Sequence, residues 1–297
     1  MSDYIIIGGD LRFIYAAAAL NSPDDGRACS VYGFETLHED VRRETGVRVL
    51  TKPQRCANVI LPLPMSRNCD YITAPYHSGK IAISQVADFC AADTHGNTTI
   101  FCGKACPQIV QLCEERGYTL VDYFEREELT IANAAITSEG ALEIIMREKP
   151  KAIMGMSVLI TGYGRIAKIL ARQLVALSAS VTIAARKHED LAWARLAGCR
   201  AVNIADMDDT LADFDTIVNT VPHCVLTQER LALLREDCLV LDLASKSGVE
   251  GMDVCAKSPY GTVAGVKVIW ALSLPGKVAP VTAGEIIANT ILLSGGE

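Results

Sequence analysis

The sequence predicts an α/β protein built on two doubly wound, mostly parallel sheets. Short apolar runs of strand length alternate with segments of helical spacing along the whole chain, which is the pattern of parallel sheets covered by helices. Two of these runs lead directly into a glycine-rich turn and then a helical pattern, once near Gly8 and once near Gly162. The length of 297 residues is enough for two domains that each bury a core.

The first half of the chain contains predicted strands at residues 4–7, 29–32, 58–61, 98–101 and 119–122, and predicted helices at 11–20 and 126–147. Pro62 and Pro64 end the third strand, because proline cannot continue a hydrogen-bonded ladder. Lys149 precedes Pro150, and the residue before a proline disfavours helix. The first domain, expected to carry the substrate and catalytic groups, is therefore placed at residues 1–148.

The second half repeats the alternation. Strands are expected at 157–161, 180–184, 201–203, 216–219, 239–243 and near 267–270, with helices at 165–177 and 189–197. A last amphipathic helix is expected at 282–293. We predict a cofactor-binding domain at 149–277 and assign residues 278–297 to the first domain.

The composition excludes several classes of protein. With 50% hydrophobic and 21% charged residues, the chain differs from disordered, collagen-like and coiled-coil sequences. No apolar run approaches the roughly 18 residues of a membrane helix, and the N-terminus lacks the basic region of a secretory signal. A net charge of -7 disfavours nucleic-acid binding by bulk charge. We therefore expect a cytoplasmic enzyme that acts on a small molecule, without membrane or nucleic-acid partners.

The 11 cysteines are scattered, form no C-x-x-C motif and have no histidine near their tightest group, Cys102, Cys106 and Cys113. This pattern predicts small buried side chains that stay reduced, and no metal site.

Residues 157–167 carry the strongest local motif, S-V-L-I-T-G-Y-G-R-I-A. It is G-x-G-x-x-A directly after an apolar strand and at the start of a helix, as in Rossmann-type dinucleotide sites. Gly162 permits the tight turn, Gly164 lets the backbone approach a pyrophosphate, and the helix N-terminus offers N–H groups to it. The alternative is a packing turn without a ligand. The predicted cofactor contacts here are Gly162, Tyr163, Gly164, Arg165 and Ile166.

The end of the next strand favours NADP(H) over NAD(H). An acidic residue at this point would accept a hydrogen bond from the ribose 2′-hydroxyl, but Ala185 is followed by Arg186 and Lys187. A guanidinium suits a 2′-phosphate and can also stack on adenine. The alternative is a solvated basic strand end. The predicted contacts are Ala185, Arg186 and Lys187.

Two later strand ends complete the predicted cofactor site, since ligands of such sheets bind at the carboxyl ends of the strands. After the strand at 216–219, small or apolar residues let the chain pass close to the ribose of the cofactor. After the strand at 239–243, polar groups are expected to face the nicotinamide. The alternative is that both segments are plain turns. The predicted contacts are Thr220, Val221, Pro222, Leu243, Ala244, Ser245 and Lys246.

Hydroxyl, amide and cationic groups elsewhere suit a small carboxylated substrate, although each could instead be structural. The predicted substrate contacts are Ser66, Arg67, Asn133, Thr137, Lys277 and Thr282. The turn at Gly8 lacks the full glycine spacing, so no second dinucleotide site is expected there. Asp10 is predicted to cap the helix that follows.

Seven segments, in order along the chain, form a pattern more specific than the glycine turn alone. They are I-G-G-D-L-R at 7–12, I-L-P-L-P at 60–64, Y-F-E-R-E-E-L at 123–129, T-S-E-G at 137–140, N-T-V-P at 219–222, L-D-L-A-S-K at 241–246 and L-P-G-K-V-A-P-V-T-A-G-E-I-I-A-N at 274–289. Together they resemble the A subunits of dipicolinate synthase, which makes the pyridine-2,6-dicarboxylate of bacterial spores. One departure is Ala167, an accepted variant where related sequences often have a third glycine.

This resemblance implies two Rossmann-like domains with a substrate cleft between them, related to the 2-hydroxyacid and alanine dehydrogenases, with the C-terminal helix packed on the first domain. It implies a cytoplasmic, NADP-dependent oxidoreductase of the mother cell of a sporulating bacterium. The implied reaction is oxidation of dihydrodipicolinate, or its hydroxytetrahydro precursor, to dipicolinate. It further implies an oligomer that works with a flavoprotein-like second subunit.

The catalytic base stays open among His77, Glu139 and His223. Two other functions also stay open. One is an NADP-dependent dehydrogenase of another small 2-hydroxy or amino acid, and the other is a non-catalytic NADP-binding subunit.

Overall fold

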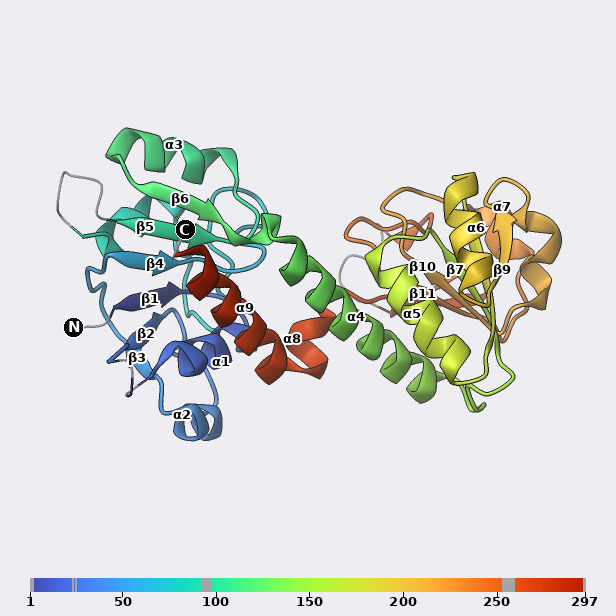
Figure 1. The fold of residues 1–297 in the computed structure, drawn as a ribbon, viewed down its shortest axis with the longest axis horizontal. Helices are drawn as coiled ribbons and strands as arrows, with labels where there is room; N and C mark the ends of the chain where they lie inside the picture. The colour runs from blue at the N-terminus through green and yellow to red at the C-terminus, as the bar shows by residue number, and fades with distance from the viewer. Residues whose placement is uncertain (1–2, 23, 25, 92–97, 253–259, 296–297) are drawn as a thin grey trace. The chain divides into compact units, whose positions relative to one another are not determined.

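The computed structural model describes residues 3–22, 24, 26–91, 98–252 and 260–295. The backbone forms two compact units, each built on one sheet (Figure 1). The first unit comprises Met1–Ala132 and Pro275–Glu297, and the second comprises Asn133–Leu274. Helix α4, Glu127–Glu148, begins in the first unit and continues in the second. The two-unit α/β architecture is confirmed, whereas the domain limits at 148 and 277 remain predictions.

The first unit contains a parallel sheet of six strands in the order β3-β2-β1-β4-β5-β6. The strands are β1 Tyr4–Ile7, β2 Cys29–Tyr32, β3 Arg48–Leu50, β4 Asn58–Ile60, β5 Thr99–Cys102 and β6 Thr119–Asp122. The direction of strand addition reverses between β1 and β4. Doubly wound sheets bind their ligands at the carboxyl ends of the strands that flank such a reversal.

Helices cover both faces of this sheet. They are α1 Leu11–Leu20, α2 Glu39–Thr45, α3 Pro107–Arg116, α8 Leu274–Val278 and α9 Pro280–Ser294, with 3-10 turns η1 Ile83–Phe89 and η2 Tyr123–Glu125. Successive strand residues point to opposite faces. Ile6 therefore packs in one apolar cluster with side chains of α1 and α9, while Ile5 and Ile7 pack in another with those of η1 and α3.

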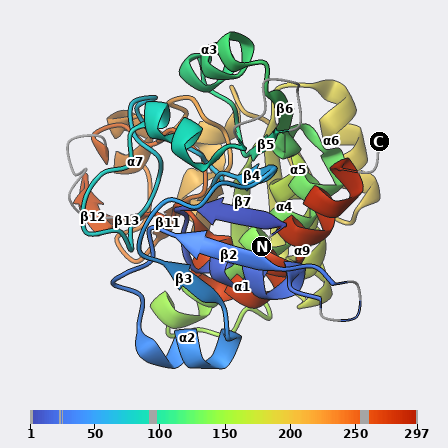
Figure 2. The ribbon, with the colours of Figure 1, turned by 90° about the vertical axis from the view of Figure 1, so that its left-hand side faces the viewer.

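The C-terminal helix α9 packs against α1, as expected from the resemblance (Figure 2). The approach is close, because a Cβ at Gly284 would lie 2.5 Å from the carbonyl oxygen of Arg12. Ile287 and Ile291 are fully buried with the side chains of α1. Only a glycine therefore allows this crossing.

The second unit contains a sheet of seven strands in the order β12-β13-β11-β10-β7-β8-β9. The strands are β7 Ser157–Thr161, β8 Ser180–Ala185, β9 Arg200–Asn203, β10 Thr216–Asn219, β11 Leu239–Asp242, β12 Tyr260–Val263 and β13 Val266–Trp270. Only β12, at the edge, runs antiparallel to its neighbour. The reversal of strand order falls between β7 and β10.

Two layers cover this sheet as well. The helices are α5 Arg165–Ala176, α6 His188–Leu196 and α7 Gln228–Ala232, with a 3-10 turn η3 at Met207–Asp213. Val158 and Ile160 of the central strand pack in one cluster with side chains of α4, α5 and α6. Leu159 packs in the other cluster with those of η3 and α7.

Helix α4 is the one described helix that is long and apolar enough, by length and composition alone, to cross a membrane. Half of that window is buried inside the protein, and helices of protein cores pass the same test. Among the ten described cysteines none forms a disulfide, and all except Cys69 and Cys224 are buried. Burial raises the pKa of thiols such as Cys113, to about 11, so these side chains are protonated and inert.

The ion-paired carboxylate of Asp215 stabilises the second unit at the amino ends of its strands. It accepts the N–H of Ser157 at 3.0 Å and contacts Lys151 at 3.0 Å and Arg235 at 3.3 Å. Burial would raise the pKa of Asp215, but these donors outweigh it and the pKa is lowered. A carboxyl with a lower pKa in the folded state stabilises the fold above its unfolded pKa of about 3.9 and loses this effect as the pH falls.

We therefore expect Asp215→Asn to lower the free energy of unfolding by about 1–2 kcal/mol at neutral pH. The difference from the unsubstituted chain should be smaller at pH 3, because below the unfolded pKa of about 3.9 protonation increasingly opposes the ion pairs of Asp215. Urea unfolding at the two pH values measures this. An equal loss at both would contradict the electrostatic assignment, and nucleotide affinity should not change.

Candidate active site

The fold of the protein itself requires the first glycine of the turn between β7 and α5. Gly162 has a φ of 88°, and a Cβ there would lie 2.7 Å from Thr220 Oγ1. Its N–H donates to the carbonyl of Ala184 at 2.8 Å. A side chain at Gly162 would therefore be strained by both backbone and neighbour.

Gly164 differs, because nothing in the protein requires it to be glycine. Its backbone is extended, with φ −81° and ψ −169°, which any residue can adopt. A Cβ there would meet no protein atom within 4 Å. Gly164 also precedes α5 without forming a side-chain cap, and the amino end of a helix carries N–H groups that have no partner within the helix. This is the arrangement that a pyrophosphate needs.

Three polar side chains connect the carboxyl ends of β7, β10 and β11. Thr161 Oγ1 donates to Asn219 Oδ1 at 2.6 Å, and Asn219 Nδ2 donates to Asp242 Oδ1 at 2.7 Å. All three residues are fully buried. Loss of solvent raises the pKa of Asp242, while the donors around it oppose that change. None of these three side chains was predicted as a cofactor contact, although a polar residue closes each of these strands.

The same network holds the two loops that were predicted to contact the cofactor. The N–H of Val221 donates to Asn219 Oδ1 at 3.1 Å, after β10. After β11, the N–H groups of Ala244 and Gly248 donate to the two oxygens of Asp242 at 3.1 and 2.8 Å. Buried hydrogen bonds therefore hold both loops in place before a ligand binds, so that little conformational entropy is lost on binding.

The basic residues after β8 lie at the surface. Arg186 directly follows the last residue of β8 and is exposed. In the described part of the chain it forms neither a hydrogen bond nor an ion pair. Lys187 forms an exposed ion pair with Glu189 at 3.3 Å. The guanidinium of Arg186 is thus available at the position where the adenosine ribose of a dinucleotide lies in such folds.

The glycine turn of the first unit is filled by protein. The N–H of Gly8 donates to the carbonyl of Tyr32 at 2.8 Å, and that of Gly9 to the carbonyl of Thr73 at 2.7 Å. A Cβ at Gly8 would lie 2.8 Å from Thr73 O. The loop at Thr73 therefore fills the space beside this glycine turn, whereas the corresponding space beside Gly164 in the second unit is open to a ligand.

Asp10 caps α1, as predicted, and also binds a buried arginine. Its carboxylate accepts the N–H of Arg12 at 3.1 Å, and the guanidinium of Arg12 at 2.8 and 2.9 Å. The same guanidinium donates to the carbonyl of Leu63 at 2.6 Å. A Cβ at Gly276 would lie 2.9 Å from Asp10 Oδ2. This pair holds together the turn after β1, the loop after β4 and the start of the C-terminal segment.

The loops after β2 and β4 form a histidine–carboxylate pair. His77 Nδ1 lies 2.8 Å from Glu35 Oε2, and the two side chains are 16% and 31% exposed. The imidazole ring packs against Tyr32, with 5.7 Å between ring centroids. Among the described residues, Nε2 has no hydrogen-bond partner. A carboxylate on Nδ1 fixes the tautomer whose Nε2 carries the free lone pair, as required of a general base. Glu35 was not predicted from the sequence.

The other predicted residues are dispersed. Ser66, Arg67, Lys277 and Thr282 belong to the first unit, and Asn133, Thr137, Glu139 and His223 to the second. The hydroxyl of Ser66 donates to the carbonyl of Tyr71 at 2.6 Å, and that of Thr137 to the carbonyl of Asn133 at 2.7 Å. Their roles in substrate binding or catalysis remain predictions. No cluster of three metal-ligating side chains occurs within the described residues.

Two family models match the chain. Residues 3–124 match the N-terminal domain of the dipicolinate synthase A subunits, and residues 128–266 match the NAD-binding domain of the D-isomer specific 2-hydroxyacid dehydrogenases. The A subunit of dipicolinate synthase from Bacillus subtilis is 28% identical over 96% of this chain and 93% of its own length. Over nearly its whole length the chain is therefore similar to the A subunits of dipicolinate synthase. The resemblance expected from the seven sequence segments is confirmed.

Solved structures agree with this assignment. The A subunit of dipicolinate synthase from Bacillus halodurans matches 100% of this chain and 98% of its own at a TM-score of 0.80 and 26% identity. That of the Bacillus subtilis enzyme matches 99% and 96% at a TM-score of 0.76 and 26% identity. An L-alanine dehydrogenase shares the fold, at a TM-score of 0.62, 16% identity and 98% and 88% coverage. The chain is an oxidoreductase with an NAD(P)-binding dehydrogenase domain.

Proposed function

We propose that this chain oxidises a partly reduced pyridine-2,6-dicarboxylate to dipicolinate, with NADP⁺ as the oxidant. The observation that carries this proposal is the open glycine turn at Gly164, in a chain similar over nearly its whole length to dipicolinate synthase A subunits. The turn and the loops after β8, β10 and β11 would hold the nucleotide. When bound, its nicotinamide accepts a hydride from a ring carbon of the substrate.

His77 is proposed to take the proton that the substrate loses together with the hydride. Glu35 holds the imidazole through Nδ1 at 2.8 Å, which leaves Nε2 to act as the base. Loss of one hydride and one proton converts a dihydro ring into the aromatic product, whereas the hydroxytetrahydro form must also lose water. The neighbouring Tyr76 stays protonated, because burial and then the charge of Asp10 raise its pKa.

The substrate's two carboxylates are proposed to bind exposed cations and hydroxyls. Arg67 and Lys277 of the first unit are exposed, and neither forms an ion pair within the described residues. Each can therefore meet a carboxylate without breaking an existing contact. Further polar contacts are assigned to Ser66, Asn133, Thr137 and Thr282.

Arg186 is proposed to select NADP(H) over NAD(H). We expect Arg186→Ala to weaken NADPH binding by about 1–3 kcal/mol, because a charge-assisted contact to the 2′-phosphate is lost. NADH lacks that phosphate, so its affinity should change much less. Titration of both nucleotides into both proteins measures this. Equal losses for the two nucleotides would contradict the assignment, and Arg195→Ala, on the outer part of α6, serves as the matched control.

We further propose that the chain works in an oligomer with a flavoprotein-like second subunit, in the cytoplasm of the mother cell of a sporulating bacterium. The support is the name of its relatives, which are the A subunits of a synthase. The buried, protonated cysteines suit a reducing compartment.

A reconstituted assay tests the proposed function. The chain is incubated with NADP⁺ and freshly prepared dihydrodipicolinate, with and without the second subunit, and both dipicolinate and NADPH are measured by absorbance. We expect the two products in equal amounts. If NADPH binds but no dipicolinate forms even with the second subunit, the chain is a non-catalytic nucleotide-binding subunit. If other 2-hydroxy or amino acids reduce NADP⁺ instead, the substrate assignment is wrong.

A further inference from the structure

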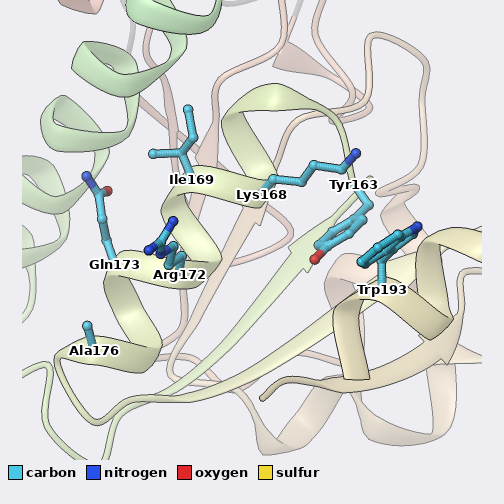
Figure 3. Close-up of a pocket in the computed structure, with 7 residues that line it drawn as sticks. All are labelled: Tyr163, Lys168, Ile169, Arg172, Gln173, Ala176 and Trp193. Atoms are coloured by element: carbon cyan, nitrogen blue, oxygen red, sulfur yellow. The ribbon is translucent and has the colours of Figure 1, made fainter. Parts of the chain in front are cut away.

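A hollow of about 680 Å³ lies along α5 and is also lined by Tyr163 of the cofactor turn and Trp193 of α6. Its walls combine two aromatic rings, aliphatic side chains, an amide and two cations (Figure 3). Its polar and aromatic walls are formed by Tyr163, Lys168, Arg172, Gln173 and Trp193. This volume and this mixture of apolar walls with a few polar groups are typical of sites for small molecules.

The hollow is electropositive in an acidic protein. Helix α5, Arg165–Ala176, contains three cations and no carboxylate, although the whole chain has a net charge of -7. Lys168 and Arg172 form no ion pair within the described residues. The ammonium of Lys168 lies 5.5 Å from the centroid of the Tyr163 ring. Two adjacent cations without anionic partners favour a bound anion, since each gains a charge-assisted contact.

The aromatic side chains of the hollow indicate that such an anion should contain a flat ring. Trp193 is 62% exposed, and its ring lies beside that of Tyr163 at one end of the hollow (Figure 3). Burial of the phenol, with smaller effects of Cys199 and Asp190, raises the pKa of Tyr163, so its hydroxyl remains a donor. A flat ring between or upon these side chains would gain stacking and remove an exposed tryptophan from water. The buried Oε1 of Gln173 has no hydrogen-bond partner among the residues that the structure describes.

We propose that this hollow is a second ligand site, which binds a small planar aromatic carboxylate. The ring of the ligand lies against Trp193 and Tyr163, and its carboxylate pairs with Lys168 and Arg172. The guanidinium of Arg172 can bind a carboxylate through two parallel hydrogen bonds. Tyr163 stands between the two glycines of the cofactor turn and is itself a predicted cofactor contact, so the site adjoins the nucleotide site and shares this one residue with it.

The test uses pyridine-2,6-dicarboxylate as the probe and the full chain without nucleotide. Trp193 is one of two tryptophans, and as the exposed one it reports on the hollow by fluorescence. We expect saturable quenching that disappears in Trp193→Phe. The double variant Lys168→Gln, Arg172→Gln should bind the probe at least tenfold more weakly. Arg195→Gln, which removes an exposed cation from the helix that carries Trp193, should bind it normally.

Quenching by cyclohexanecarboxylate should be much weaker, because that ring cannot stack. Quenching that rises linearly without saturation, that persists in Trp193→Phe, or that is unchanged in the double variant would overturn the proposal. The second tryptophan, Trp270, donates to the carbonyl of Ala244 at 2.9 Å and reports on a cofactor loop instead, so only the quenching that is lost in Trp193→Phe belongs to the hollow. Arg67→Gln therefore should leave the saturable quenching intact.

Discussion

Replacing Gly164 by valine is expected to abolish NADPH binding while the chain stays folded. The structure separates the two effects, because the backbone at Gly164 is extended and an added Cβ would meet no protein atom within 4 Å. A branched side chain would instead fill the space through which a pyrophosphate reaches the N–H groups of α5. We expect the Kd to rise about 100-fold or more, equivalent to roughly 3 kcal/mol.

Two companion variants make this result specific. Gly164→Ala should weaken binding less than valine does, since it adds one carbon to the same space. Gly162→Ala should lower thermal stability as well as affinity, because φ there is 88° and the Cβ would lie 2.7 Å from Thr220 Oγ1. Calorimetric titration and thermal unfolding of the three variants provide the comparison. If the Gly164→Val protein is folded and binds NADPH with normal affinity, the nucleotide does not bind at this turn.

Replacing His77 by glutamine is expected to reduce kcat by about 10²–10⁴, the usual contribution of a general base. Nucleotide affinity should not change, because His77 and the cofactor turn belong to different units. Glu35→Gln should reduce kcat less and should alter the pH dependence of the rate, since the amide still fills the space but no longer stabilises the protonated imidazole. Steady-state rates across a pH series measure both variants.

The chain provides a matched control for this experiment. His38 forms another histidine–carboxylate pair, with Asp40 at 3.2 Å, but its side chain is 77% exposed. His38→Gln should leave kcat and its pH dependence as they are. If His77→Gln retains full activity, the base must be sought among Glu139 and His223. If His38→Gln is as damaging as His77→Gln, the loss is structural.

The elements around the cofactor turn could be predicted because their signals are local. The apolar run of β7, the glycines and the start of α5 lie within 11 residues, and the observed bounds agree with those expected. Three of the elements that prediction missed have weak patterns: α2 contains no buried residue, β3 has three residues, and β12 is a largely exposed antiparallel edge. Helix α3 was missed as well, although Pro107 and Gly117 mark its two ends. Their structure depends on the sheet that they join.

The contact between His77 and Glu35 could not be predicted from the sequence. His77 could be selected as a candidate, but Glu35 is 42 residues away in the sequence. Neither residue lies in a regular element. The two meet because β2 and β4 both flank β1 in the parallel sheet, so that the loops after them start at the same, carboxyl end of the strands. Such a contact depends on strand order, which no local pattern encodes. The polar residues that end β7, β10 and β11 are a different case, since their repetition at strand ends was available in the sequence.

We propose that this chain itself oxidises the ring, with NADP⁺ bound at the Gly164 turn. The most direct measurement uses dihydrodipicolinate that carries deuterium at the ring carbons that can lose hydride, and follows the isotope during turnover. Direct transfer predicts deuterium at C4 of the reduced nicotinamide, one equivalent for each dipicolinate formed, and loss of both products in Gly164→Val. Dipicolinate formed without deuterated NADPH, or formed at an undiminished rate by Gly164→Val, would contradict the account.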